Sequence, residues 1–251
     1  MINSFYTAKI GATNYQSLLD VSANNLANAS TTGFKSQRIA YSDLVYTNMP
    51  AQKYSQNLPL QVGHGAKVNS ISANLEQGAV QETGHNLDVA ILGAGYFCVE
   101  RETGQRYYTR AGNFRMVNSG EEKYLITCNG ERVLDDKFQP ITIKEPGNQV
   151  ILYGPAEGES AENTIRLAVV NFDNPYALRE VGSGLLAATD QSGEGTLVSE
   201  ARLRQGALEC SNVDLATEIT KILQAQRGFQ FSARIIQTAD EIEAMANTLR
   251  S

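Results

Sequence analysis

The chain has 251 residues, of which 42% are hydrophobic and 19% charged, so it is long enough to bury a core and too apolar to be disordered throughout. Its formal net charge is −6 without a basic cluster, which argues against nucleic acid as a partner. No apolar run approaches the roughly 18 residues of a membrane span, so membrane insertion is not expected.

The first predicted element is a long helix that begins after Asn3 or Ser4 and ends between Leu18 and Lys35. Its apolar residues recur at alternating spacings of three and four, which keeps one narrow stripe turned toward a partner helix. Gly11 beside this stripe lowers helix propensity by roughly 1 kcal/mol relative to alanine, so packing must hold the helix. The stripe consists of Phe5, Ala8, Ala12, Tyr15, Leu19, Ser22 and Leu26.

Three asparagines, Asn24, Asn25 and Asn28, crowd the end of this helix. One interpretation is helix termination, because asparagine favours caps and turns and Gly33 supplies a backbone that turns freely. The other is that their amides satisfy polar groups of neighbouring molecules in a tight assembly. The residues alone leave both interpretations open.

The middle of the chain changes character twice. Residues 41–66 lose all periodicity and contain Pro50 and Pro59, which predicts an extended connector. Residues 67–208 alternate short β-rich runs with turn residues, which predicts an all-β domain. The predicted strands are Val68–Ala73, Leu87–Ile91, Tyr96–Glu100, Arg106–Arg110, Lys123–Thr127, Ile141–Ile143, Gln149–Tyr153 and Thr164–Asn171, the last half-buried by its alternation, with a hairpin turn at Asn129-Gly130.

A second long helix is predicted from Ser211, which with Asp214 resembles a capping box, to Leu249. Its first apolar seam is interrupted by Gln226, and a second seam continues one residue out of register, as a 3.6-residue helix requires over many turns. The first seam is Leu215, Ile219, Ile222, Phe229, Ala233 and Ile236, and the second is Ile235, Ala239, Ile242, Ala246 and Leu249.

The predicted fold class is therefore α+β, with long terminal helices pairing as a coiled coil around a central all-β domain. The expected domains are residues 1–40 with 209–251, the connector 41–66, and the outer β domain 67–208. Neither helix has a stripe wide enough to form a core without further neighbours.

No catalytic constellation is visible. The chain lacks a phosphate-binding loop, a nucleophile elbow and a zinc helix, and Gly93-Ala94-Gly95 is interpreted as a tight turn between strands. Three cysteines without ligand spacing are expected to be buried thiols. We therefore expect no catalytic residue, no cofactor and no metal site. Paired carboxylates for glycoside hydrolysis stay open, although nothing points to them.

Several motifs together resemble the bacterial flagellar rod and hook family of axial proteins, most closely its distal rod members. These motifs are Leu18–Arg38 (LLDVSANNLANASTTGFKSQR), Gly93–Phe97, Tyr108–Phe114 (YTRAGNF), Gln205-Gly206, Ser211–Val213 and Ala225–Arg227. The stretch Leu58–Gly63 also resembles the distal rod members. A short connector from Tyr46 to Asn57, and Gly228 where the family usually has alanine, keep a proximal rod or hook-like paralogue as an alternative.

The resemblance implies a structural subunit that polymerises helically into a hollow drive shaft, which transmits torque and encloses the export channel. It implies as partners other copies of the chain, other rod and hook proteins, the surrounding bushing rings and, in transit, the export apparatus. It also implies a location in the basal body outside the cytoplasm, reached without a cleaved signal peptide, and no such signal is visible at the N-terminus.

The expected assembly residues are Phe5, Tyr15, Leu19, Asn24, Asn25, Leu26, Asn28, Ile219, Ile222, Gln226, Arg227, Phe229, Ile236, Ile242 and Leu249. A hypothesis from another class is a soluble β-rich binding or hydrolytic domain whose helices only dimerise it. Deleting residues 1–35 distinguishes the two, since it abolishes polymerisation in the first case and spares ligand binding or turnover in the second.

Overall fold

A computed structural model describes residues 2–48, 61–101, 103–119, 122–143, 151–152, 164–198 and 201–249. The chain divides into two compact units. The helical unit comprises Met1–Ala27, Gln37–Asn74 and Val213–Ser251, and the β body comprises Asn28–Ser36 and Leu75–Asn212. A helix at each end and a β-rich middle confirm the α+β class. The division differs from the predicted domain boundaries, since residues 28–36 group with the β body and residues 37–74 with the helices.

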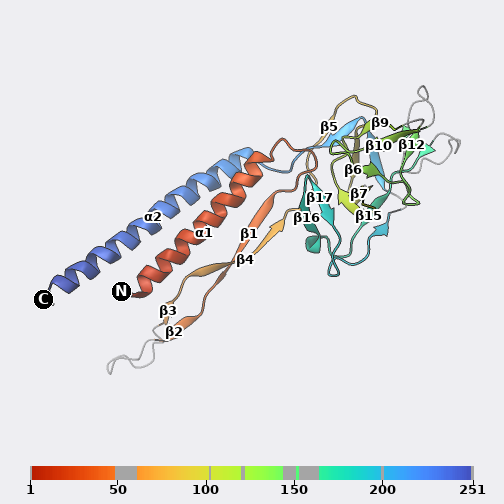
Figure 1. Cartoon of the computed structure of the whole chain (residues 1–251). Coiled ribbons are helices and arrows are strands. Elements are labelled where there is room, and N and C mark those ends of the chain that lie inside the picture. The colour runs from red at the N-terminus through yellow and green to blue at the C-terminus, as the bar shows by residue number, and fades with distance from the viewer. Residues whose placement is uncertain are drawn as a thin grey trace. The chain divides into compact units, whose positions relative to one another are not determined.

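Two helices lie side by side in the helical unit, α1 (Ile2–Ala27) and α2 (Leu215–Thr248) (Figure 1). They run antiparallel, because Gly11 lies against Ser232 whereas Tyr15, further along α1, lies against the earlier Gly228. At 34 residues, α2 is longer than the 26-residue α1, so its C-terminal turns extend past the beginning of α1.

The residues that the two helices bury are mostly small or polar. Those of α1 are Ala8, Val21, Ser22 and Asn25, and those of α2 are Glu218, Ala225 and Ser232 at spacings of seven. Two glycines, Gly11 and Gly228, allow close approach at the same interface. We call this interface the small-residue seam. It differs from the predicted apolar seam, most of whose members on α2 lie outside it.

Asp214 caps α2. Its side chain accepts hydrogen bonds from the Ala216 N–H at 3.2 Å and from the Thr217 hydroxyl at 2.5 Å, which lowers the pKa of Asp214, with the Thr217 bond as the larger cause. The predicted capping box beginning at Ser211 is therefore wrong. Residues 211–213 are a linker before the helix, and the acid at the end of the proposed box is itself the cap.

An antiparallel ribbon completes the helical unit. It pairs β1 (Gln37–Asp43) with β4 (Ala66–Ala73), and β2 (Tyr46–Asn48) with β3 (Gln61–Gly63). The Asn14 amide of α1 donates to the Ala66 carbonyl at 2.5 Å, tying ribbon to helix. The described part of the predicted connector 41–66 is thus hydrogen-bonded ribbon, and residues 49–60, with Pro50 and Pro59, lie outside the described residues.

The β body is built on one large sheet in the order β12-β10-β11-β7-β8-β17-β16, with β9 on β10, and β15 joining β7 to β18. Two further pairs, β5–β20 and β6–β19, and the short parallel pair β13–β14 accompany it. The bounds are β5 Val80–Glu82, β6 Val89–Leu92, β7 Tyr96–Glu100, β8 Arg106–Thr109, β9 Arg115–Ser119, β10 Glu122–Ile126, β11 Arg132–Val133, β12 Thr142–Ile143, β13 Ile151–Leu152, β14 Thr164–Ile165, β15 Val169–Asn171, β16 Arg179–Gly182, β17 Leu185–Ala187, β18 Thr196–Leu197, β19 Arg202–Gln205 and β20 Ala207–Glu209, with a 3₁₀ turn at Pro175–Ala177.

The core lies on both faces of β7. Phe97 and Val99 point into one apolar cluster with Leu125, while Tyr96 and Cys98 point into a second. The predicted strand Tyr96–Glu100 is confirmed, as is the turn at Asn129-Gly130, where Gly130 has a φ of 97° and its N–H donates to the Thr127 carbonyl.

Two predictions about burial are wrong. The run Thr164–Asn171 is two strands rather than one, and its described residues Leu167 to Val170 are buried on both faces, because odd residues enter one apolar cluster and even residues the other. Of the three cysteines, only Cys98 is buried, whereas Cys128, in the hairpin turn, is exposed.

Candidate functional site

The outer face of the helix pair carries large apolar side chains. Those exposed on α2 and its C-cap are Leu215, Ile219, Leu223, Phe229, Phe231, Ile235, Ile242, Met245 and Leu249, and those on α1 are Phe5 and Tyr6. We call these residues the exposed helix face. Since the helices contact each other through small residues, this apolar surface is left uncovered in the helical unit. So many large apolar side chains left exposed on two helices favour an interaction site.

The predicted assembly residues fall into three groups. Phe5, Asn24, Ile219, Gln226, Arg227, Phe229, Ile242 and Leu249 are exposed, whereas Tyr15, Leu19, Leu26, Asn28, Ile222 and Ile236 are partly buried. Asn25 alone is buried. All belong to the helical unit except Asn28, which belongs to the β body. Their role in assembly stays a proposal.

Asn25 makes its contacts inside the chain. Its amide nitrogen donates to the Gln37 carbonyl at 2.8 Å, and its amide oxygen accepts from the Gln37 N–H at 2.8 Å. The side chain thus makes the same two hydrogen bonds to Gln37 that a neighbouring strand residue would make, and it fixes the beginning of β1 to the last turn of α1. With 1% of its surface exposed, Asn25 is a link within the subunit, and a contact of this residue with a neighbour stays a proposal.

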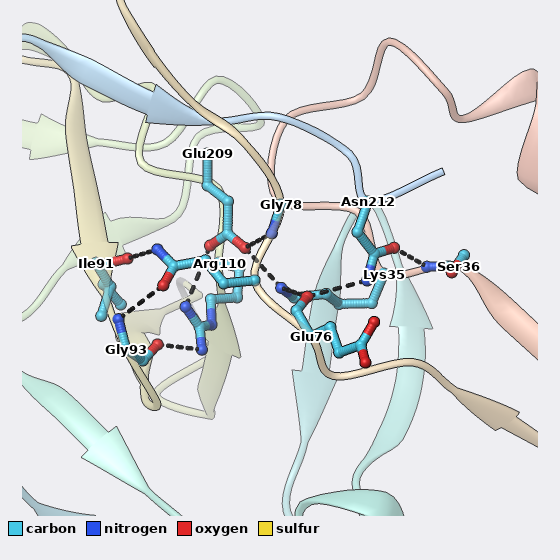
Figure 2. Close-up of polar contacts among 10 residues, drawn as sticks. Lys35, Ser36, Glu76, Gly78, Ile91, Gly93, Arg110, Glu209 and Asn212 are labelled. Atoms are coloured by element: carbon cyan, nitrogen blue, oxygen red, sulfur yellow. Dashed lines mark hydrogen bonds and ion pairs between the residues drawn. The ribbon is translucent and has the colours of Figure 1, made fainter. Parts of the chain in front are cut away.

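A second site lies in the β body, where three buried charges meet. Figure 2 shows the Glu209 carboxylate between the Lys35 ammonium group and the Arg110 guanidinium group. Lys35 Nζ lies 2.6 Å from Glu209 Oε1, and Arg110 Nη1 lies 3.1 Å from Glu209 Oε2. The backbone N–H of Gly78 donates to Oε1 at 3.0 Å. We call Lys35, Arg110 and Glu209 the clasp.

The clasp holds together the two segments that adjoin the helices in the chain. Segment 28–36 follows α1, and segment 209–212 precedes α2. Ser36 N–H donates to Asn212 Oδ1 at 2.7 Å, and the Asn212 amide donates to the Glu76 carbonyl at 3.0 Å (Figure 2). Lys35 Nζ donates to the same carbonyl at 2.7 Å, so segment 75–78 joins the other two.

The charges of the clasp do not balance. Two cations share one carboxylate, and all three side chains are at most 10% exposed. Burial lowers the pKa of Lys35 below its ordinary value, although the hydrogen bond and ion pair with Glu209 act in the opposite direction. Arg110 also donates to the Gly93 carbonyl at 2.8 Å, but its buried Nε has no hydrogen-bond partner among the described residues.

Sequence reasoning missed the clasp, although it had singled out the motifs that form it. Lys35 ends TTGFK, Arg110 stands within YTRAG, Gly93 begins the glycine-aromatic motif, and Asn212 stands within Ser211–Val213. These motifs are far apart in the chain and meet at Glu209. Close backbone approach adds to the junction, since a β-carbon at Gly33 would lie 2.7 Å from the backbone of Arg110.

The described residues contain no group of three or more His, Cys, Asp or Glu side chains placed to hold a metal ion. Among the helices of that part of the chain, none is long and apolar enough to cross a membrane. What they do present is an α+β protein whose paired terminal helices carry an uncovered apolar face.

Comparisons with known proteins agree with that class of protein. Three family models match the chain: "Flagella basal body rod protein" over residues 5–35, "Flagellar hook protein FlgE/F/G D1 domain" over residues 90–157, and "Flagellar basal body rod FlgEFG protein C-terminal" over residues 204–249. The flagellar basal-body rod protein FlgG of Borreliella burgdorferi is 36% identical across 100% of this chain and 99% of its own length. The FlgG protein of Bacillus subtilis is 34% identical, covering 96% and 97%.

The chain therefore belongs to the flagellar basal-body rod protein family, and its resemblance to the distal rod members is confirmed. The family also has a hook-side relative of similar length, the flagellar hook-basal body complex protein FlhP of Bacillus subtilis, which is 28% identical over the full length of both chains.

Proposed function

We propose that this chain is a non-enzymatic, structural subunit of the bacterial flagellar rod, and that it assembles with copies of itself through the exposed helix face. Membership of the rod family supports the class of function. The observation that supports the mode of assembly is the position of Ile219, Leu223 and Phe229, which are large, apolar and exposed on a helix whose buried residues are small or polar.

The physical reason is the distribution of apolar area. Fully burying an exposed side chain of this size contributes about 1.5–3 kcal/mol, and since these side chains are about half exposed, each leaves roughly 1 kcal/mol unused in the subunit. A surface that meets a different surface on the next copy forms an open helical filament when the rotation does not close. Copies of the chain are therefore the proposed occupant of this face.

We further propose a place for each unit in the assembled rod. The helix pair is a short antiparallel coiled coil that forms the inner tube, and the β body forms the outer layer. The resulting hollow shaft transmits torque and encloses the export channel. Its partners are further copies, other rod and hook proteins, the bushing rings and, in transit, the export apparatus, at the basal body outside the cytoplasm.

The test replaces one exposed apolar residue in each unit. Ile219→Ser removes an exposed side chain from α2, and Val117→Ser is the matched control on β9, since the two residues are 48% and 46% exposed. In cells lacking the chromosomal copy, we expect Ile219→Ser to abolish motility and incorporation into purified basal bodies. We expect Ile219→Leu and Val117→Ser to retain both.

Monomer stability separates assembly from folding. Because Ile219 is exposed, thermal unfolding of the purified Ile219→Ser monomer should match that of the unsubstituted chain. Normal basal bodies with Ile219→Ser, or equal losses with both serine variants, would contradict assembly through this face. Electron microscopy of basal bodies that locates the chain along the axis would distinguish distal rod, proximal rod and hook.

A further inference from the structure

We propose that Glu209 is a positioning residue that makes the order of segment 28–36 depend on segment 209–212, so that the linkers of both helices are fixed on the β body together. The proposal concerns the single subunit and holds whether or not the chain polymerises. It assigns the clasp a conformational role, namely that segment 28–36 has no fixed position on the β body until segment 209–212 is in place.

The hydrogen bonds of segment 28–36 supply the first argument. Four of them tie residues 33–36 to residues 209–212, two through side chains of the later segment. They join Gly33 N–H to the Glu209 carbonyl (2.8 Å), Lys35 Nζ to Glu209 Oε1 (2.6 Å), Ser36 N–H to Asn212 Oδ1 (2.7 Å) and Asn212 N–H to the Phe34 carbonyl (3.4 Å). Without residues 209–212, the backbone of 33–36 loses these partners.

The β body holds Glu209 independently of Lys35. Pairing of β20 with β5 places Glu209 beside Gly78, because Glu209 is opposite Val80 in that ladder. Lys35, 174 residues away in the chain, therefore docks on a carboxylate that strand pairing already positions.

The excess of one positive charge in the clasp predicts different effects for the loss of Glu209 and the loss of Lys35. Removing the charge of Glu209 leaves two cations buried beside each other, and an uncompensated buried charge is strongly destabilising. Removing the charge of Lys35 instead leaves one balanced pair, Arg110 with Glu209. The two substitutions should therefore have very different effects, although both break the same 2.6 Å contact.

The experiment measures amide hydrogen exchange in the full-length monomer. In Glu209→Gln we expect exchange of the Gly33 and Ser36 amides to rise at least about tenfold, and in Lys35→Met by less than about threefold. In the double variant Glu209→Gln/Lys35→Met, exchange should be slower than in Glu209→Gln alone, because one of the two unpaired cations is gone. A residue that served only general packing would show no such rescue.

Two controls separate the clasp from general stability. Glu82→Gln removes a carboxylate from an exposed ion pair with Arg204 and should leave Gly33 and Ser36 unchanged. The Leu125 amide, which donates to the Ile141 carbonyl in the core, should show a clearly smaller rise than Gly33 and Ser36 in Glu209→Gln. Protection of Gly33 and Ser36 in Glu209→Gln, an equal rise at Leu125, or a double variant no better than the single one would overturn the proposal.

A variant without a charge change tests the proposal even if the Glu209→Gln chain does not fold. Asn212→Ala removes the acceptor of the Ser36 N–H and leaves the clasp charges in place. If the linkers are ordered together, exchange should rise at Gly33 as well, although Gly33 donates to Glu209 and not to Asn212. A rise confined to Ser36 would overturn the coupling.

Discussion

The ring of Tyr15 on α1 occupies the space in front of Gly228 on α2, so that a β-carbon at 228 would lie 2.5 Å from Tyr15 Cε1. The absence of a side chain at Gly228 therefore leaves the space that the ring fills. It explains why a helix of 34 residues keeps a glycine near its middle, where alanine would favour the helix by roughly 1 kcal/mol.

Gly228→Ala should accordingly destabilise the chain by about 1 kcal/mol, because overpacking costs about 1–3 kcal/mol and the gain in helix propensity recovers part of it. The free energy of unfolding in urea measures the effect. With Tyr15→Leu already present, the same substitution should become stabilising. A stabilising Gly228→Ala in the presence of Tyr15 would show that the ring moves aside freely.

Asn25→Asp tests the link between α1 and β1. The carboxylate still accepts from Gln37 N–H but faces the Gln37 carbonyl with no donor, which leaves a buried acceptor unsatisfied and costs about 1–3 kcal/mol. Asn24→Asp is the control for placing a negative charge at a helix C-terminus, since Asn24 is exposed. Thermal unfolding should separate the two variants. Equal losses would assign the effect to the helix dipole.

The lowered pKa of Lys35 predicts that the free energy of unfolding depends on pH. Since its folded-state pKa lies below the ordinary value of 10.5, the unfolded chain binds more protons at this site, and the contribution of Lys35 to stability rises with pH from the folded-state pKa up to 10.5. The difference in unfolding free energy between the unsubstituted chain and Lys35→Met should therefore increase with pH across that window. A difference that falls or stays constant would contradict the lowered pKa.

The cysteines predict a labelling pattern. Burial raises the pKa of Cys98 to about 12, so at pH 8 this thiol is both protonated and inaccessible. Cys128 is exposed and should react with a maleimide at the rate of a free thiol, whereas Cys98 should react only when the β body opens. Mass spectrometry after brief labelling distinguishes the two sites. Rapid modification of Cys98 in the native chain would contradict its burial.

Periodicity predicted both helices, the β body and the buried stripe of α1, in which Ala8 and Ser22 are buried, but not the face that α2 buries. Sequence reasoning placed large apolar residues such as Ile219 and Phe229 at the seam of α2, because hydrophobic residues are usually buried. The buried residues of α2 are instead Glu218, Ala225 and Ser232. Small residues repeating at spacings of seven on α2 were the available signal.

The clasp was beyond prediction for a different reason. Periodicity reports only local structure, whereas Lys35, Arg110 and Glu209 meet through the pairing of strands distant in sequence. Alternation failed in a similar way at Leu167 to Val170, because a strand with apolar clusters on both faces shows no polar face to reveal its period.

The extra length of α2 has a thermal consequence. Residues 242–248 continue α2 beyond the first residues of α1, so these turns lack the packing on α1 that stabilises the rest of the helix. Fixing these turns costs about 1–2 kcal/mol of conformational entropy per residue, and any surface that covers Ile242 and Met245 must offset that cost. Contacts at this end of the subunit should therefore weaken on warming sooner than contacts along the paired part of the helices.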